Sequence, residues 1–132
     1  MVTMTKTPVP DDVRRFILTS VPSVPMLEAL LLLRAEPCAG WEPLGLARRL
    51  YVGEPHALEL LHALQHAGLA ERDERGRFRY EPDSEAMRQL LDRVAATHAA
   101  NLVAVTDLIH SRVDKRALQF AEAFRFRKKE GP

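Results

Sequence analysis

The middle of the chain places a helical pattern directly before a hairpin pattern, within the stretch GEPHALELLHALQHAGLAERDERGRFRYEP (Gly53–Pro82). Its first half carries apolar residues at intervals of three and four: Ala57, Leu60, Leu61 and Leu64. This spacing predicts a helix from about Glu54 to Ala67, ended by Gly68 in the left-handed conformation. The second half, LAERD and then RFRYE on either side of a turn with Gly76, predicts two short strands in a hairpin. The residues expected to be buried there are Leu69, Phe78 and Tyr80.

Three helical segments are expected before this unit. The first follows Asp11 and Asp12, carries Val13, Phe16 and Ile17 on one side, and ends at Val21-Pro22, because the residue before a proline avoids the helical region. Ser23 is a suitable N-cap for the second, from about Val24 to Arg34, which is apolar nearly all round and is therefore expected to be buried. After a loop at Glu36–Gly40, the third covers Pro43–Leu50. Its predicted inward face is Leu44, Ala47 and Leu50.

A long helix is expected after the hairpin. It begins around Ser84 and extends for about 28 residues, which is long for so small a domain. Its stripe consists of Met87, Leu90, Leu91, Val94, Ala95, His98, Leu102, Val105 and Ile109. Beyond Ala99 more than one face is apolar, which favours a symmetric homodimer. The predicted dimer-interface residues are Leu91, Val94, His98, Leu102, Val105, Ile109 and Phe124. The alternative is that the N-terminal helix and a last helix, about 114–127, cover the second face within one chain.

Composition describes an ordinary globular protein. The 132 residues are 46% apolar and 28% charged, with a formal net charge of +1, and one domain is the default for this length. The single Cys38 allows no disulfide and no cysteine-based zinc site within one chain. The N-terminus has no apolar signal region, and the apolar run Met26–Leu33 is too short to span a bilayer. A cytoplasmic protein without membrane association is expected.

The order helix, short helix, turn, helix and hairpin resembles the winged helix-turn-helix proteins. The resemblance is carried by Leu44, Ala47 and Leu50, by the run from Ala57 through Leu61 and Leu64 to Ala67-Gly68-Leu69, and by a two-stranded wing at Glu71–Pro82. With the long helix added, the chain is similar to MarR- and PadR-type transcriptional regulators. This resemblance implies a mostly α fold with a long C-terminal dimerisation helix. The implied divisions are 1–22 (arm and short helix), 23–82 (winged domain), 83–127 (dimerisation region) and 128–132 (basic tail).

The resemblance also implies contacts with double-stranded DNA. It places Pro55, His56, Leu58, Glu59 and His62 on the face that would enter a major groove, and Arg48 and Arg49 near the DNA backbone. The alternating Arg75, Arg77 and Arg79 would follow a minor groove along the wing. The helix expected to read bases has no Lys or Arg, although arginine and lysine make the commonest specific base contacts. The alternative for the wing arginines is a solvated strand face on which they pair with neighbouring acids. The alternative for the whole chain is a protein-interaction module, in which the acidic, histidine-bearing face of the same helix docks a basic partner.

Other candidate sites have simpler explanations. The spacing of Glu59, His62 and His66 would suit a transition metal, but a solvated helix face explains it equally, and no metal or other cofactor is expected. His98 is interpreted as an interface histidine, Trp41 as an anchor for the third helical segment, and Cys38 as a loop thiol. The sequence has no phosphate-binding glycine loop and no nucleophile motif, so no enzyme activity is expected. A small-molecule effector is imaginable, but no residue identifies one.

Overall fold

The computed structural model describes residues 8–111, which form six helices and one hairpin. The labelled elements are α1 (Asp11–Ser20), α2 (Val24–Ala35), α3 (Pro43–Leu50), α4 (Glu54–His66), β1 (Ala70–Arg72), β2 (Phe78–Tyr80) and α5 (Glu85–Ala100). A further helix occupies Leu102–Ser111, where the described residues end. The last predicted helix, at about 114–127, lies outside them, as do the basic tail and Phe124.

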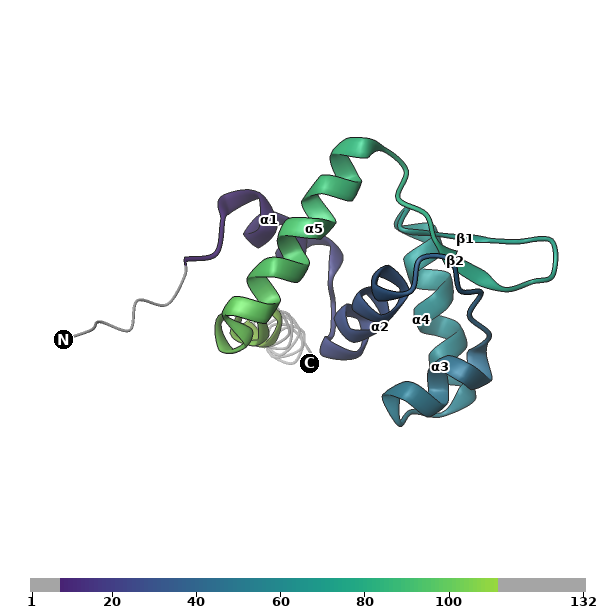
Figure 1. The fold of residues 1–132 in the computed structure, drawn as a ribbon. Coiled ribbons are helices and arrows are strands. Elements are labelled where there is room, and N and C mark those ends of the chain that lie inside the picture. Colours follow the sequence, from purple (N-terminus) through teal and green to yellow (C-terminus); the bar gives the residue numbers. More distant parts are fainter. Residues whose placement is uncertain (1–7, 112–132) are drawn as a thin grey trace, which may run out of the picture.

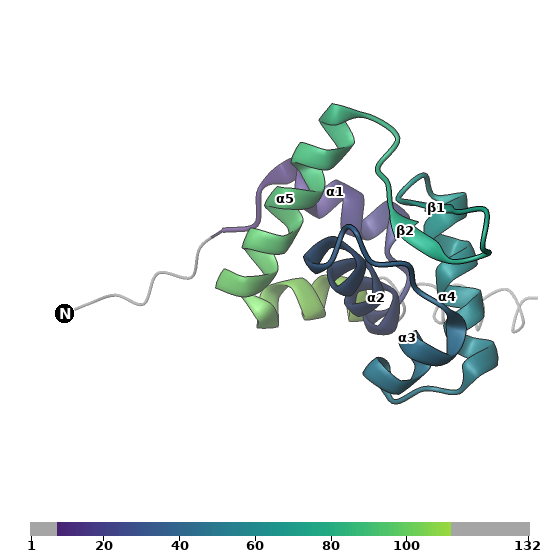
Figure 2. The same ribbon diagram turned by 45° about the vertical axis from the view of Figure 1, so that its right-hand side comes forward.

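The apolar helix α2 lies at the centre of the fold. On one side of it are α3, α4 and the hairpin, which projects away from the helices; on the other are α1 and α5 (Figures 1 and 2). Five of the twelve residues of α2 are buried, including Leu27, Leu30 and Leu33. The predicted burial of this helix is therefore confirmed, and one continuous core joins the two sides of the molecule.

The helix ends follow from local sequence. Ser23 and Ser84 cap α2 and α5, because their hydroxyl groups accept hydrogen bonds from the backbone N–H of Met26 and Met87, at 3.3 and 3.1 Å. The chain leaves α4 through Gly68, whose φ is +79°. A Cβ atom there would collide with the carboxylate of Asp83, so both the backbone conformation and the close approach require glycine.

The predicted hairpin is confirmed, with β1 and β2 antiparallel and Ala70 opposite Tyr80. Leu69, Phe78 and Tyr80 are buried as expected. Trp41 adds a bridge that the sequence pattern did not reveal: its backbone exchanges two hydrogen bonds with Phe78, at 2.8 and 2.9 Å. The loop before α3 is thereby joined to the wing.

The predicted inward face of α3 is partly wrong. Leu44 is 45% exposed, whereas Leu46 is fully buried beside Ala47. The helix is only eight residues long and packs against both α2 and α4, so its buried side is set by two neighbours rather than by a single stripe.

The predicted continuous helix after the hairpin is wrong at Asn101. The backbone there has φ −150° and ψ 66°, which ends α5 after Ala100. The Asn101 side chain then accepts a hydrogen bond from the N–H of Ala104 at 3.3 Å, as an N-cap does. Asparagine is a poor residue for a helix interior and a good one for a cap, because its side chain competes for backbone N–H groups. The apolar stripe therefore belongs to two helices of different direction.

Much of the apolar surface of these two helices is already covered within one chain. Four residues predicted for a dimer interface have at most 1% of their surface exposed: Leu91, Val94, Val105 and Ile109. α1 packs on α5 through its buried face, and Arg93 of α5 is paired with Asp12 of α1. His98 is half-buried, and Leu102 is 56% exposed next to Val103 at 60%. Of the predicted interface residues that the structure describes, Leu102 is the exposed one.

Within residues 8–111, no single helix combines the length and the apolar composition needed to cross a membrane. The bent pair α1 and α2 meets both criteria only when the two helices are counted together.

Candidate nucleic-acid interface

α4 lies between α3 and the hairpin, so the residues predicted to contact DNA belong to one contiguous part of the molecule (Figure 2). The side of α4 opposite its buried residues is exposed: Pro55, His56, Leu58, Glu59 and His62. The ring of His62 lies 5.6 Å from that of the buried Phe78, which places it next to the base of the wing. The predicted outward face of this helix is confirmed, but its role in binding DNA stays a prediction.

The two arginines at the end of α3 are both exposed and differ in their partners. Arg49 forms an ion pair with Glu36 at 3.3 Å, and its guanidinium lies over the ring of Trp41, 5.5 Å from the centroid. Arg48 has no hydrogen-bond or ion-pair partner within residues 8–111. Arg48 is therefore the cation of this pair that can meet a phosphate without giving up an internal ion pair.

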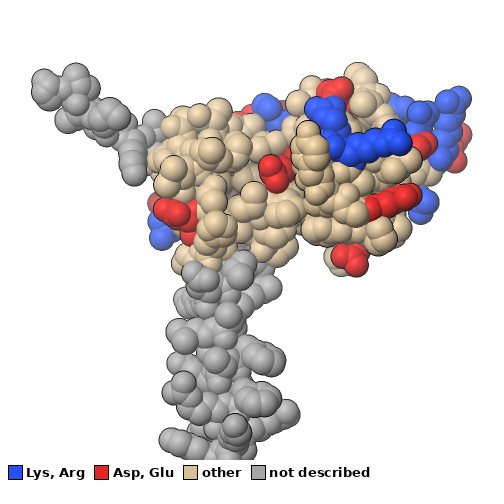
Figure 3. Space-filling view, turned by 90° about the horizontal axis from the view of Figure 1, so that it is seen from below, with Lys and Arg blue, Asp and Glu red and all other residues tan. Residues whose placement is uncertain are grey.

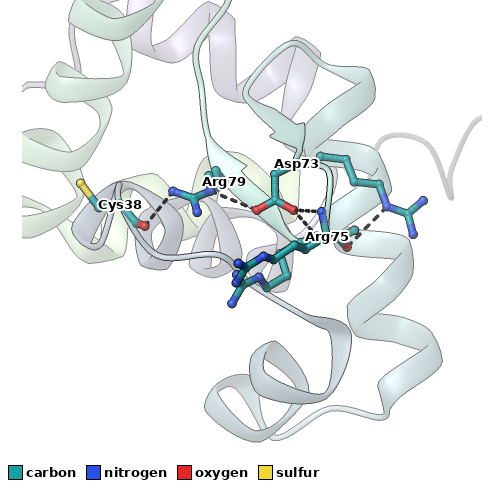
Figure 4. Close-up of polar contacts among 7 residues, drawn as sticks. Cys38, Asp73, Arg75 and Arg79 are labelled. Carbon is teal, nitrogen blue, oxygen red and sulfur yellow. Dashed lines mark hydrogen bonds and ion pairs between the residues drawn. The ribbon is translucent and has the colours of Figure 1, made fainter.

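The wing tip is organised by a single carboxylate (Figure 4). Asp73 accepts hydrogen bonds from the backbone N–H of Arg75 and of Arg77, both at 2.9 Å, and from Nε of Arg79 at 3.2 Å. The N–H of Arg77 contributes most to holding the pKa of Asp73 below its ordinary value of 3.8, with help from Arg79 and from the N–H of Arg75. The carboxylate thus stays ionised and closes the turn.

Arg79 has a structural role as well. Its second guanidinium nitrogen donates to the backbone carbonyl of Cys38 at 3.0 Å, which ties the wing to the loop after α2 (Figure 4). Arg77 is half-buried beside Gly40, whereas Arg75 is exposed and its side chain has no partner among the described residues. The structure brings all three predicted wing arginines to one open recess, which Asp73 and Glu74 also line.

Positive charge is therefore present, but acidic residues outnumber the basic ones in this region. Residues 36–81 contain six arginines and no lysine, against eight Asp and Glu residues. Figure 3 shows blue side chains gathered towards the wing end of one face with red side chains beside them. Contact with phosphate would depend on which cations are unpaired, because paired arginines must first release their acids.

Two residues of this region were missed by sequence reasoning. Arg72 of β1 lies 5.5 Å over the ring of Phe78, and its Nε donates to the carbonyl of Gly76. Tyr51, in the turn between α3 and α4, is 95% exposed and has a φ of +58°. The alternation of arginines could have drawn attention to Arg72, but nothing in the sequence marks Tyr51 as left-handed.

The other candidate sites are placed as follows. No group of three potential metal ligands converges within residues 8–111, which include Glu59, His62 and His66. The thiol of Cys38 is exposed in the loop after α2. Trp41 is 7% exposed, so its prediction as an anchor for the start of α3 is confirmed.

A solved structure shares this arrangement. A MarR family transcription regulator, SP03579, superposes with a TM-score of 0.50 and 23% identity, over 90% of this chain and 82% of that one. A MarR family protein of Mycobacterium tuberculosis, Rv2887, in complex with DNA is also similar, with a TM-score of 0.48 and 22% identity over 94% of this chain and 89% of that one. MepR of Staphylococcus aureus, a transcription regulator of the multidrug efflux pump MepA, has a TM-score of 0.49 and 14% identity over 86% of this chain and 85% of that one. Comparisons with protein-family models and with curated proteins give no match. The predicted winged helix-turn-helix fold is confirmed.

Proposed function

We propose that this chain is a DNA-binding transcriptional regulator that works as a homodimer and acts by binding rather than by catalysis. The supporting observation is the position of two unpartnered cations, Arg48 and Arg75, on the elements that flank the exposed face of α4. The chain also shares its fold with SP03579, a MarR family transcription regulator. In this proposal Arg48, Arg49 and the wing arginines hold the phosphate backbone, and α4 enters the groove.

The proposal predicts weak, strongly salt-dependent binding to DNA of random sequence. Base readout by α4 has few donors, because Glu59, His56 and His62 replace the usual arginines. Glu54 and Glu59 would also face phosphates. Most of the affinity therefore comes from backbone contacts, whose number sets the salt dependence.

Dimer formation is part of the proposal, because two wings double the number of phosphate contacts. Leu102 and Val103 supply exposed apolar surface at the start of the helix Leu102–Ser111. The proposed division keeps residues 23–82 for DNA and 83–127 for the dimer, with the arm at 1–22 and the basic tail at 128–132. Residues 112–132 carry seven Lys and Arg against three Asp and Glu, which favours DNA over a basic partner.

A fluorescence-anisotropy titration of labelled random duplex at several salt concentrations tests this function. The variant Arg48→Ala/Arg75→Ala removes two unpartnered cations from the proposed interface. We expect the slope of log affinity against log salt to become shallower by about 0.9 for each phosphate that the variant no longer neutralises.

The matched control is Arg14→Ala/Arg15→Ala, which removes the same charge from the exposed side of α1, on the other side of α2. Equal slopes for the two double variants would contradict the proposed interface. Absence of binding at low salt would contradict DNA binding altogether and favour the rival function, in which the acidic, histidine-bearing face of α4 docks a basic protein.

A further inference from the structure

A recess of about 370 Å³ opens between the loop after α2, the start of α3 and the wing. The residues that matter in it are Glu36, Gly40, Trp41, Glu42, Gly45 and Arg77. Of these, the sequence pattern predicted a DNA contact for Arg77 alone. The recess is distinct from the open one at the wing tip, although Arg77 lines both.

Two residues that line this recess each carry a buried hydrogen-bond donor without an acceptor. The indole Nε1 of Trp41 and the Nε of Arg77 are both closed to solvent, and neither has a partner among the described protein atoms. Trp41 as a whole is more than nine-tenths buried, since 7% of its surface is exposed. Indole and guanidinium nitrogens can only donate, and buried donors without acceptors are rare and destabilising. An acceptor that reached both atoms would therefore be bound favourably.

The start of α3 adds a further positive feature to the recess. Glu42 is the N-cap, yet its side chain makes no capping hydrogen bond, and Pro43 opens the helix. The backbone N–H of Gly45 in the first turn accordingly has no helical acceptor, and the positive end of the helix dipole is directed towards the same region. A Cβ atom on Gly45 would have no neighbour within 4 Å, so the space beside it is open.

Gly40 sets the position of Arg77. A Cβ atom on Gly40 would lie 3.0 Å from Cβ and 3.1 Å from Nε of Arg77. Because glycine has no side chain, the arginine lies flat against the loop with its Nε next to the backbone. The Nε of Arg77 is closed to solvent in this position, and a shift of the side chain away from Gly40 would expose it.

The acids of the recess determine the charge that it accepts. Glu36 is paired with Arg49 at 3.3 Å, and Arg49 also lies over the Trp41 ring. Glu42 has no ion-pair partner within residues 8–111. The positive charge of Arg77 and of the N-terminus of α3 is thus opposed by one unpaired carboxylate, that of Glu42. This balance suits an oxyanion with a single charge and several acceptor oxygens better than a more highly charged group.

We propose that the recess binds a singly charged oxyanion, a phosphodiester of the DNA backbone, through Trp41 Nε1, the Arg77 guanidinium and the first-turn amides of α3. This inference rests on the proposed function, because it assigns one phosphate contact of that interface to the loop before α3. A small oxyanion free in solution shares the same chemistry and is separated from DNA by the experiment.

Trp41 is the chain's only tryptophan, so its fluorescence emission reports on this recess alone. In one arm the wild-type chain is titrated with a short random duplex, and in the other with sodium phosphate against sodium chloride of equal ionic strength. We expect the duplex to change Trp41 emission in a saturable way, and phosphate to do so more weakly. The variant Arg75→Ala, which does not line the recess, should need more duplex but reach the same final emission.

Two substitutions then test the donors and the acid. Trp41→Phe keeps an aromatic ring and removes the N–H, and should weaken duplex binding by about tenfold, the effect of losing one hydrogen bond to a charged group. Glu42→Gln removes the opposing carboxylate from an exposed position and should tighten binding severalfold. If Glu42 had a purely structural role, Glu42→Gln would not tighten duplex binding. This variant therefore still tests the site if circular dichroism shows that Trp41→Phe folds poorly.

The outcomes separate the site from the proposed function. Wild-type affinity in Trp41→Phe and Glu42→Gln, together with weaker binding in Arg75→Ala, would overturn the recess and leave DNA binding intact. An emission response to phosphate without duplex binding would overturn both the phosphodiester assignment and the proposed function. Unchanged emission in both arms would overturn the recess as an oxyanion site.

Discussion

The wing and α4 occupy neighbouring positions on the same side of α2, but they offer a partner opposite kinds of surface. α4 exposes Glu54 and Glu59, and neither has an ion-pair partner within residues 8–111. The wing is rich in arginine, yet Arg79 is already committed to Asp73 and to the Cys38 carbonyl. The acids of the helix are thus available, whereas part of the wing's positive charge is used to hold the wing in place. Fold position alone does not decide which groups a partner meets.

The largest expected effect is a loss of stability on changing Phe78, the wing residue that contacts α4. Phe78 is 1% exposed, lies beside His62 of α4 and pairs through its backbone with Trp41. Phe78→Ala should lower the free energy of unfolding by about 3–5 kcal/mol, because the cavity cannot be filled from the short strand. Urea denaturation measures this change. Leu58→Ala, at an exposed site on α4, is the control and should cost far less; equal losses would mean that the wing is not anchored through Phe78.

The next largest effect is expected on DNA affinity, when the exposed acids that distinguish α4 from the wing are removed. Glu54→Gln/Glu59→Gln removes both exposed carboxylates from α4 and keeps their size. We expect duplex binding to strengthen by about 1 kcal/mol, roughly fivefold, because two groups that repel phosphate are neutralised at a solvent-exposed surface. Anisotropy titration at low salt provides the measurement. Glu28→Gln, an exposed acid on α2, serves as the control, and an unchanged affinity in the double variant would show that α4 does not approach the backbone.

A smaller effect is expected in the turn that joins α3 to α4. Tyr51 has a left-handed backbone and is almost fully exposed, so it carries conformational strain with little packing in return. Tyr51→Gly should stabilise the fold by about 0.5–1 kcal/mol, since relief of the strain exceeds the entropy that glycine adds to the unfolded chain. Thermal unfolding tests the sign. If DNA affinity falls while stability rises, Tyr51 contributes to the contact surface of α4.

The smallest expected effect is the pH dependence of the stability that Asp73 contributes. The pKa of Asp73 is held below its ordinary value of 3.8, chiefly by the N–H of Arg77, so the ionised form is favoured by folding. The stabilisation is complete above that ordinary value and is lost as the pH falls through the lower folded pKa. Asp73→Asn should therefore reduce stability at neutral pH but make little difference at the acid end of a pH series of urea denaturations. A constant difference between the two proteins at all pH values would contradict this role for the carboxylate.

Local signals predicted most of the fold. The bounds of α3 and the caps at Ser23 and Gly68 depend on proline, serine and glycine within a few residues, and the structure agrees with them. The break at Asn101 also had a local signal, an asparagine after two alanines, but the longer apolar stripe concealed it. Periodicity indicates which side of a helix is apolar, and it does not show whether the helix continues.

The candidate site was less predictable because its contacts join distant parts of the chain. Arg79 and Cys38 are separated by 41 positions, and Arg77 meets Gly40 only once the wing has packed on the loop. Sequence alternation placed three arginines on one face correctly, but it could not show which of them are occupied. Nor could it show that the Trp41 indole is buried without an acceptor.

The closed turn from Asp73 to Arg77 has a consequence for how the wing meets any partner. Its hydrogen bonds exist before contact, so the backbone freedom that a loose hairpin would surrender on docking has already been given up during folding. A binding partner therefore meets a preorganised turn instead of a flexible loop. Disrupting the hydrogen bonds of this turn should shorten the lifetime of a complex while leaving its rate of formation nearly constant.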